Sequence, residues 1–136
     1  MGLSGEVFGG EYFMVIGLGL DICEVSRMDR NLRDNRFISR FFTDEEAAYI
    51  RSRGSSAAQT MAGLFASREA LGKAIGGGID FDLKEAEICH DPNGRPYFHL
   101  SGHLAERTSG SRFLLSITHD GGIAAAVCIR ETVPES

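Results

Sequence analysis

Glu69 and Lys73 lie four residues apart in the stretch GLFASREALGKAIGGG, residues 63–78, within an otherwise apolar pattern. On a helix, residues at this spacing share a face, and Phe65 falls on the same strip. An exposed ion pair of this kind contributes only about 0.3–0.5 kcal/mol. The apolar neighbours favour a second interpretation, in which the carboxylate and the ammonium group face a bound ligand.

Glycines are frequent in and after this segment. Gly63 and Gly72 lie inside it, at a cost of about 1 kcal/mol each relative to alanine, and Gly76, Gly77 and Gly78 follow directly. Because glycine has no side chain, this distribution predicts the close approach of another backbone segment or of a ligand.

Asp21 ends the apolar segment MVIGLGLDI, which predicts a buried strand with glycine at positions 17 and 19. Mg²⁺ is commonly bound by one or two carboxylates, with phosphate oxygens and water completing the octahedron. A site for phosphoryl chemistry is therefore one hypothesis beside the exposed ion pair. In it, Asp21 and Glu69 bind the metal and Lys73 neutralises phosphate charge. A Mg²⁺-dependent phosphohydrolase is one alternative at this point.

His119 and Asp120 occur together in the segment THDGG. Their simplest interpretation is an aspartate that forms a turn and a histidine near a sheet edge. The other histidines, His90, His99 and His103, are assigned no function.

The order of the strands and helices that the sequence predicts indicates an α+β domain, with a mostly antiparallel sheet packed on a long central helix. The expected order is β-α-α-α-β-β-α-β-β. Strand 14–22 is followed by helices within 24–33, 43–54 and 56–76, a helical turn at 35–42, a hairpin at 86–100, a short helix within 101–110 and a hairpin at 112–131.

Two helix starts carry capping signals. Thr43 with Glu46 has the spacing of a capping box, and Ser56 with Gln59 repeats the pattern at the start of the central helix. Gly54 and Gly76 follow the predicted helices, as glycine commonly does at a helix end.

Composition limits the class of protein. The 136 residues suffice for one domain, with 43% hydrophobic and 24% charged residues. No apolar run reaches the roughly 18–20 residues of a membrane span, and the three cysteines indicate reduced thiols, so we expect a cytoplasmic protein without a membrane partner. A net charge of −5 argues against nucleic-acid binding.

Residues 1–13 are interpreted as an N-terminal extension or an expression-vector remnant, and residues 14–136 as the domain.

One segment is basic despite the acidic total. Between residues 27 and 40, five arginines stand against two aspartates, a local net charge of +3. The arginines are Arg27, Arg30, Arg33, Arg36 and Arg40. This cluster is either a solvated helix face or a docking surface for an acidic partner.

Four segments together are similar to a known family. MVIGLGLDICEVSR, FASREALGKAIGGGID, DPNGRP and LLSITHDGGIAAAVCI resemble, in order and spacing, the holo-[acyl-carrier-protein] synthases, the short class of 4′-phosphopantetheinyl transferases. The resemblance covers nearly everything from Met14 to Glu131. It implies the fold of that family and transfer of the 4′-phosphopantetheine arm of coenzyme A to a serine of an acyl carrier protein, with adenosine 3′,5′-bisphosphate released. It also implies a role in fatty acid or polyketide biosynthesis, and a homotrimer with active sites at subunit interfaces.

The resemblance also implies roles for single residues. Asp21 and Glu69 would bind Mg²⁺; Glu69, or a water held by it, would act as base. Lys73 would hold the phosphate, and His119 falls on a Ser-His motif that borders the coenzyme A pocket. The candidate coenzyme A ligands are Arg68, Lys73, Gly76, Gly77, Gly78 and His119. The family's first helix supplies basic residues to the carrier protein, which here are Arg27, Arg30 and Arg33.

Two positions depart from the family pattern. Leu64 stands where the family usually has arginine before the FA pair, and Arg68 stands where it usually has lysine before the EA pair. Arginine keeps the positive charge but does not deprotonate. Leu64 removes a cation that could contact a phosphate of coenzyme A. These departures leave open a second hypothesis, a module that binds carrier proteins without transferring anything.

Overall fold

The computed structural model describes residues 7–8 and 11–134 of the chain, with side chains from residue 13 onward. Strands β1 (Val7–Phe8) and β2 (Glu11–Tyr12) pair antiparallel within the predicted N-terminal extension. The remainder of that predicted extension, residues 1–6 and 9–10, lies outside the described residues.

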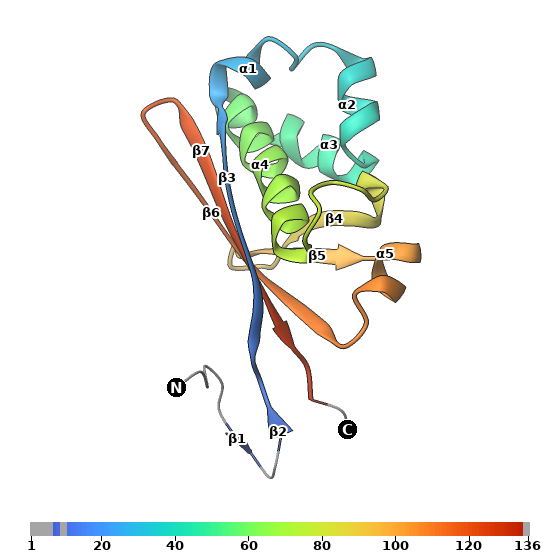
Figure 1. Ribbon diagram of the computed structural model, residues 1–136. Coiled ribbons are helices and arrows are strands. Elements are labelled where there is room, and N and C mark those ends of the chain that lie inside the picture. Colours follow the sequence, from blue (N-terminus) through green and yellow to red (C-terminus); the bar gives the residue numbers. More distant parts are fainter. Residues whose placement is uncertain (1–6, 9–10, 135–136) are drawn as a thin grey trace.

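The main sheet consists of strands β3 (Val15–Glu24), β7 (Ile123–Thr132) and β6 (Ser111–Asp120), in that spatial order and all antiparallel. Helix α4 (Ala57–Ile75) covers one face of this sheet (Figure 1). The predicted fold class, an α+β domain built on an antiparallel sheet and a long central helix, is confirmed.

Glycine on β3 allows α4 to approach closely. A Cβ atom on Gly19 would overlap the carbonyl oxygen of Ala70, and one on Gly17 would overlap that of Ala74. The N-terminal half of α4 instead approaches β6, because a Cβ on Gly63 would lie 2.9 Å from Ile117 Cγ2. The helix therefore crosses the sheet diagonally, from β6 to β3.

Three short helices precede α4 in the chain. These are α1 (Val25–Asp29), α2 (Asn35–Phe41) and α3 (Asp44–Ser52). The capping box of Thr43 and Glu46 is confirmed. The capping pattern predicted for Ser56 and Gln59 is wrong. A 3₁₀ turn, η1 (Gly54–Ser56), leads directly into α4, and the Ser56 side chain makes no capping hydrogen bond. Its backbone lies at φ −94° and ψ 7°, not in the extended conformation typical of a capping residue.

The predicted hairpin 86–100 forms a two-stranded sheet of its own, from β4 (Ala86–His90) and β5 (Pro96–Leu100). The 3₁₀ turn η2 (Leu83–Glu85) precedes it, and α5 (Gly102–Arg107) follows it. The β4–β5 hairpin and α5 lie on the helix-covered side of the molecule (Figure 1).

The other face of the main sheet bears exposed apolar side chains. Ile16, Leu18, Leu20 and Ile22 of β3 are 51–64% exposed, and Leu114 of β6 is 49% exposed. No helix of the described chain is long and apolar enough to cross a membrane. The strand that the sequence predicts as buried is thus exposed on one face in the single chain, and this face is unusually apolar for a small domain.

Candidate active site

Asp21 of β3 and Lys73 of α4 meet at one edge of the sheet. Lys73 Nζ donates to Asp21 Oδ1 at 3.2 Å and to the Leu20 carbonyl at 2.9 Å. The Lys73 side chain is 52% exposed and that of Asp21 is 21% exposed, so both remain open to a ligand. An ion pair between Glu69 and Lys73 is not formed, because the lysine reaches across to the strand.

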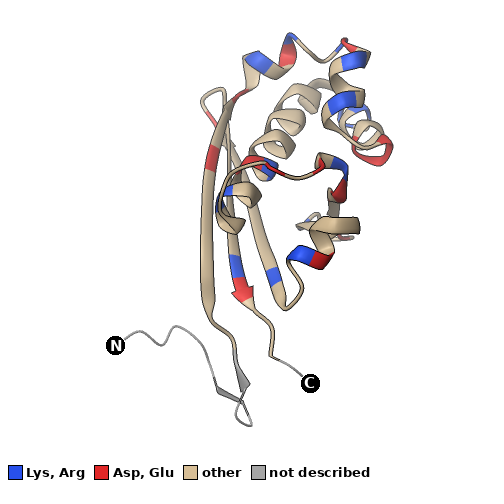
Figure 2. Cartoon of the chain, turned by 45° about the vertical axis from the view of Figure 1, so that its right-hand side comes forward, with Lys and Arg blue, Asp and Glu red and all other residues tan. Residues whose placement is uncertain are grey.

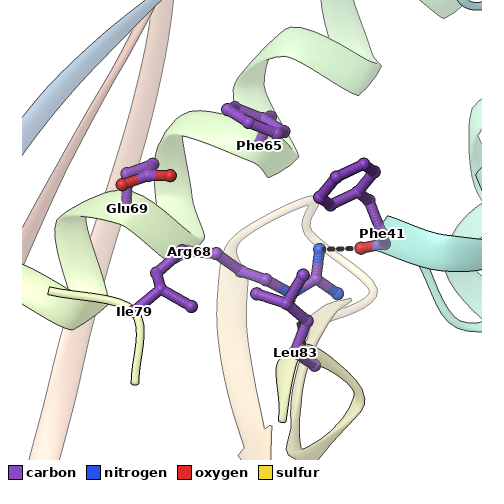
Figure 3. Close-up of a pocket in the computed structure, with 6 residues that line it drawn as sticks. All are labelled: Phe41, Phe65, Arg68, Glu69, Ile79 and Leu83. Carbon is purple, nitrogen blue, oxygen red and sulfur yellow. Dashed lines mark hydrogen bonds between the residues drawn. The ribbon is translucent and has the colours of Figure 1, made fainter. Parts of the chain in front are cut away.

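Glu69 is half-buried, one helical turn before Lys73. It lies at the rim of an apolar pocket of about 150 Å³, lined also by Phe41, Phe65, Ile79 and Leu83 (Figure 3). Within the described part of the chain, its carboxylate accepts no side-chain hydrogen bond and forms no ion pair. A carboxylate beside apolar surface without a partner is suited to bind a cation or to accept a proton.

The carboxylates of Asp21 and Glu69 suit Mg²⁺, and they are too few to coordinate a metal ion by protein side chains alone. Among residues 13–134, no group of three or more acidic, histidine or cysteine side chains is gathered at one point. Asp21 and Glu69 supply two carboxylates, the number that Mg²⁺ commonly uses when phosphate oxygens complete its coordination.

The glycine run after α4 turns back toward the helix. Gly76, Gly77 and Gly78 all have positive φ, at 101°, 92° and 72°, which disfavours other residues at these positions. A Cβ on Gly72 would lie 2.7 Å from the carbonyl carbon of Gly78. The close approach predicted at Gly72 is thus made by backbone.

Arg68 is placed differently from the prediction. Although it contributes to the pocket wall, it is only 2% exposed, and its guanidinium is directed away from Glu69 (Figure 3). The group forms an ion pair with buried Glu46 and donates to the carbonyls of Phe41, Leu83 and Ala86. Because these partners occupy its donors, we correct the predicted role of Arg68 from coenzyme A ligand to internal tether.

His119 lies on the far side of α4 from Asp21, Glu69 and Lys73. It belongs to β6, and its Nε2 would lie 3.4 Å from a Cβ on Gly63. Gly63 and Glu69 are six residues apart, about 9 Å along a helix. Strands β3 and β6 are separated by β7, which adds roughly 9.5 Å across the sheet. A single chain therefore does not bring His119 to the carboxylates.

The arginine cluster lies on α1, α2 and the segment between them, where Lys and Arg bands recur (Figure 2). The Arg27 guanidinium carbon is 4.8 Å from the centre of the Phe65 ring. Since Phe65 precedes Glu69 by one turn, the basic surface begins next to the pocket that Glu69 borders.

Glu46 has a role in the structure that the sequence does not predict. Its spacing from Thr43 predicts helix capping alone. Glu46 also binds Arg68 and accepts from the Ile88 backbone N–H at 2.8 Å. The position of a glutamate within a capping box gives no signal of this second role, because Arg68 shares the capping oxygen Oε1 and the Ile88 N–H reaches Oε2 only through the packing of distant segments.

The chain is similar in sequence to known proteins. A family model described as the 4′-phosphopantetheinyl transferase superfamily matches residues 17–128. The chain is 41% identical over 122 residues to the holo-[acyl-carrier-protein] synthase of Treponema denticola, an alignment that covers 87% of this chain and 99% of that protein.

Solved structures match over similar lengths. The holo-[acyl-carrier-protein] synthase of Neisseria meningitidis has a TM-score of 0.78 at 30% identity and covers 88% of this chain and 100% of that one. A holo-(acyl-carrier-protein) synthase from Bacillus anthracis, solved in complex with CoA (3′,5′-ADP), has a TM-score of 0.74 at 30% identity and covers 88% and 98%.

Proposed function

The chain belongs to the 4′-phosphopantetheinyl transferase superfamily, and from this premise we propose that it transfers the 4′-phosphopantetheine arm of coenzyme A to a serine of an acyl carrier protein. The serine oxygen forms a bond to the phosphorus that bears the pantetheine arm. The pyrophosphate P–O bond breaks, and adenosine 3′,5′-bisphosphate leaves. The observation that carries the proposal is the Glu69 carboxylate, which lies beside the Asp21–Lys73 pair and has no partner among the described residues.

Glu69, Lys73 and Asp21 have different roles in this reaction. Glu69, or a water that it holds, accepts the serine proton, because its carboxylate has no other hydrogen-bond partner in the described chain. Lys73 turns from Asp21 toward the pyrophosphate, where its ammonium group offsets charge on the leaving oxygen. Asp21 and Glu69 are the residues that would hold Mg²⁺. When bound, the ion supplies positive charge to the pyrophosphate as the bond breaks.

The arginine cluster gives the carrier protein its docking surface in this proposal. Carrier proteins of this kind are acidic, and Arg27, Arg30 and Arg33 are all exposed. Arg27, packed on Phe65, would hold the partner next to the reacting centre. Attraction between opposite charges speeds such an encounter, and added salt weakens it.

A transfer assay tests the proposed function. The full chain, coenzyme A and Mg²⁺ are incubated with a panel of apo acyl and peptidyl carrier proteins, and intact-protein mass spectrometry measures the gain of one phosphopantetheine group. We expect Glu69→Gln and Asp21→Asn to lower the rate by about 100-fold or more, since each removes a charged group from the transition state.

The controls separate the alternatives. Glu106→Gln, at an exposed residue on α5 whose charged neighbour is exposed His103, should transfer at the parent rate. Release of adenosine 3′,5′-bisphosphate without any carrier protein would instead indicate a phosphohydrolase. No mass gain on any carrier protein would overturn the proposal.

We further infer that the active site is completed between copies of the chain, in a homotrimer. The main sheet has two open edges, β3 with Asp21 and β6 with His119. A contact that joins the β3 edge of one copy to the β6 edge of the next is heterologous, and it closes into a ring when the rotation allows. Such a ring would cover the apolar sheet face and bring His119 of one copy to Glu69 of another.

Mixing two inactive variants tests this composite site. Glu69→Gln and His119→Ala are each expected to be slow, because each removes a group from every site of its own oligomer. After the two are unfolded and refolded together, some sites contain neither substitution, and activity should reappear. Mixing two separately prepared Glu69→Gln samples is the control. No recovery in a mixed oligomer would contradict a site shared between copies.

A further inference from the structure

Two parts of the proposed reaction lie on different helices. The base, Glu69, is on α4, whereas Arg36 and Arg40 of the arginine cluster are exposed on α2. A carrier protein that docks on this cluster presents its serine to Glu69 only if the two helices keep a fixed relation. A misplacement of about 1 Å can cost about 100-fold in rate. The contacts between α2 and α4 therefore bear on catalysis.

Arg68 makes the polar contact between these two helices. Its Nη1 donates to the carbonyl of Phe41, the last residue of α2, at 2.9 Å. Among the described residues, this is the one hydrogen bond that joins α2 to α4. The guanidinium carbon also lies 5.4 Å from the ring centre of Phe42, which is 1% exposed. The end of α2 is thus bound to α4 through a single side chain.

The same guanidinium holds a second wall of the pocket beside Glu69. Its Nε donates to the Leu83 carbonyl at 3.1 Å and to the Ala86 carbonyl at 3.2 Å. Phe41 and Leu83 both line the apolar pocket at whose rim Glu69 lies (Figure 3). Arg68 therefore fixes two walls of this pocket relative to α4, which supplies the third.

The position of Arg68 is itself fixed from the other side. Its ion-pair partner Glu46 also accepts from the backbone N–H groups of Thr43 at 2.9 Å and of Ile88 at 2.8 Å. Both charged side chains are buried. In the described part of the chain, no buried side-chain nitrogen or oxygen lacks a hydrogen-bond partner. These contacts hold the guanidinium in one place.

A lysine at position 68 could not make the same set of contacts. The carbonyls of Phe41 and Leu83 are bound by different nitrogens of the guanidinium. Lysine has one nitrogen with three donors, whereas arginine presents five donors in a rigid planar fork. Arg68→Lys would therefore keep the charge beside Glu46 but release the end of α2, the segment before β4, or both.

We propose that Arg68 is a positioning residue of the transfer reaction, which holds the docked carrier protein in register with Glu69. This inference rests on the proposed function. Arg68 is buried and touches neither substrate, so it acts through the placement of α2. Loosening this contact should slow the bond-forming step, because the serine no longer lies at the right distance from the base. The affinity for both substrates should be kept, since the groups that bind them are unchanged.

Steady-state kinetics of Arg68→Lys tests this role. We expect kcat to fall by about 10- to 100-fold, with the KM values for coenzyme A and for the carrier protein within about 3-fold of those of the parent chain. Rates are expressed per folded protein, as measured by circular dichroism. A raised KM at unchanged kcat would overturn the inference, because it would assign Arg68 to binding. Unchanged kinetics would also overturn it.

Arg51→Lys is the matched control. Arg51 also contacts α2, but through one exposed contact of 3.4 Å from its Nη2 to Asn35 Oδ1. The same change of residue type at this position should leave kcat at the parent value.

The double variant Arg68→Met/Glu46→Met separates positioning from stability. It removes the ion pair together with the contacts to the three carbonyls, and the loss of both buried charges should leave the fold stable. We expect this variant to be folded and as slow as Arg68→Lys. A stable double variant with the parent kcat would overturn the inference.

Hydrogen exchange separates this inference from the proposed function. If the unaltered chain transferred nothing, the proposed function would fail, but amide exchange would still measure the hold of Arg68 on α2. We expect faster exchange in α2 and in residues 83–88 of Arg68→Lys, with unchanged exchange in β6. Equal exchange in Arg68→Lys and the parent chain would overturn the inference whether or not transfer occurs.

Discussion

Arg68 and Glu69 are consecutive in the sequence, yet their side chains occupy different environments. Neighbours on a helix point about 100° apart. Arg68 is directed into the interior, where it joins α4 to the end of α2, to α3 through Glu46, and to η2 and the start of β4. Glu69 is directed toward the pocket (Figure 3). The buried Arg68 side chain thus fixes the position of α4, the helix that carries Glu69.

Arg68→Met should destabilise the fold, because it leaves Glu46 buried without its cation. We expect the free energy of unfolding to fall by about 3–5 kcal/mol. Urea denaturation followed by circular dichroism measures this, at one fixed protein concentration because oligomerisation shifts apparent stability.

The double variant Arg68→Met/Glu46→Met is the control for this pair. Removing both charges from the interior should recover most of the loss. A single Arg68→Met variant as stable as the parent chain would contradict the role of Arg68 as an internal tether.

At the scale of elements, the packing of α4 on β3 places the candidate catalytic groups. Gly17 and Gly19 bring the strand so close to the helix that Lys73 can reach the Leu20 carbonyl at 2.9 Å. A wider separation would carry Asp21 away from the α4 residues. The spacing between the two elements is therefore part of the active site.

Gly19→Ala should separate these elements. Its new methyl group would overlap the carbonyl oxygen of Ala70, and overpacking of this kind costs about 1–3 kcal/mol or more. We expect reduced stability in urea and a loss of transfer activity that exceeds the loss of folded protein.

Gly54→Ala serves as the comparison for Gly19→Ala. Gly54 has φ 56° and open space around it, so alanine there adds only backbone strain, about 1–2 kcal/mol. Its activity per folded molecule should equal that of the parent. Normal activity in folded Gly19→Ala would contradict the importance of the helix–strand spacing.

At the scale of the whole molecule, the two faces of the main sheet have different surroundings. One face packs on α4 (Figure 1). The other exposes the apolar side chains of β3 and β6. Contact between copies would remove this apolar surface from water, which favours association. The same contact would join the two halves of the proposed site.

Leu18→Asp should dissociate the oligomer. Leu18 is 64% exposed in the single chain, so the charge does not disturb the core, but it would be buried between copies. Sedimentation velocity should show single chains, circular dichroism should show retained structure, and transfer activity should fall with the oligomer. Tyr97→Asp, at an exposed residue on β5, should remain oligomeric. An intact, active oligomer of Leu18→Asp would exclude this face as the interface.

Local features of this protein could be predicted from its sequence. The Thr43 capping box, the glycine that ends α4, both hairpins and the face shared by Phe65 and Glu69 depend on residues close together in the chain. Family membership, which the comparisons confirm, rests on motifs of the same local kind. Ser56 is the exception, because the preceding 3₁₀ turn removed the need for its cap.

What only the tertiary structure decided is which distant groups meet. Arg68 and Glu69 are both charged residues on one helix, and helical periodicity assigns each a direction but not a neighbour. Lys73 pairs with Asp21, Arg68 pairs with Glu46, and His119 lies across α4 from the carboxylates, because long-range packing sets these distances. The sequence by itself determined the chemical groups and their local geometry; the way α4 crosses the sheet decided which of them act together.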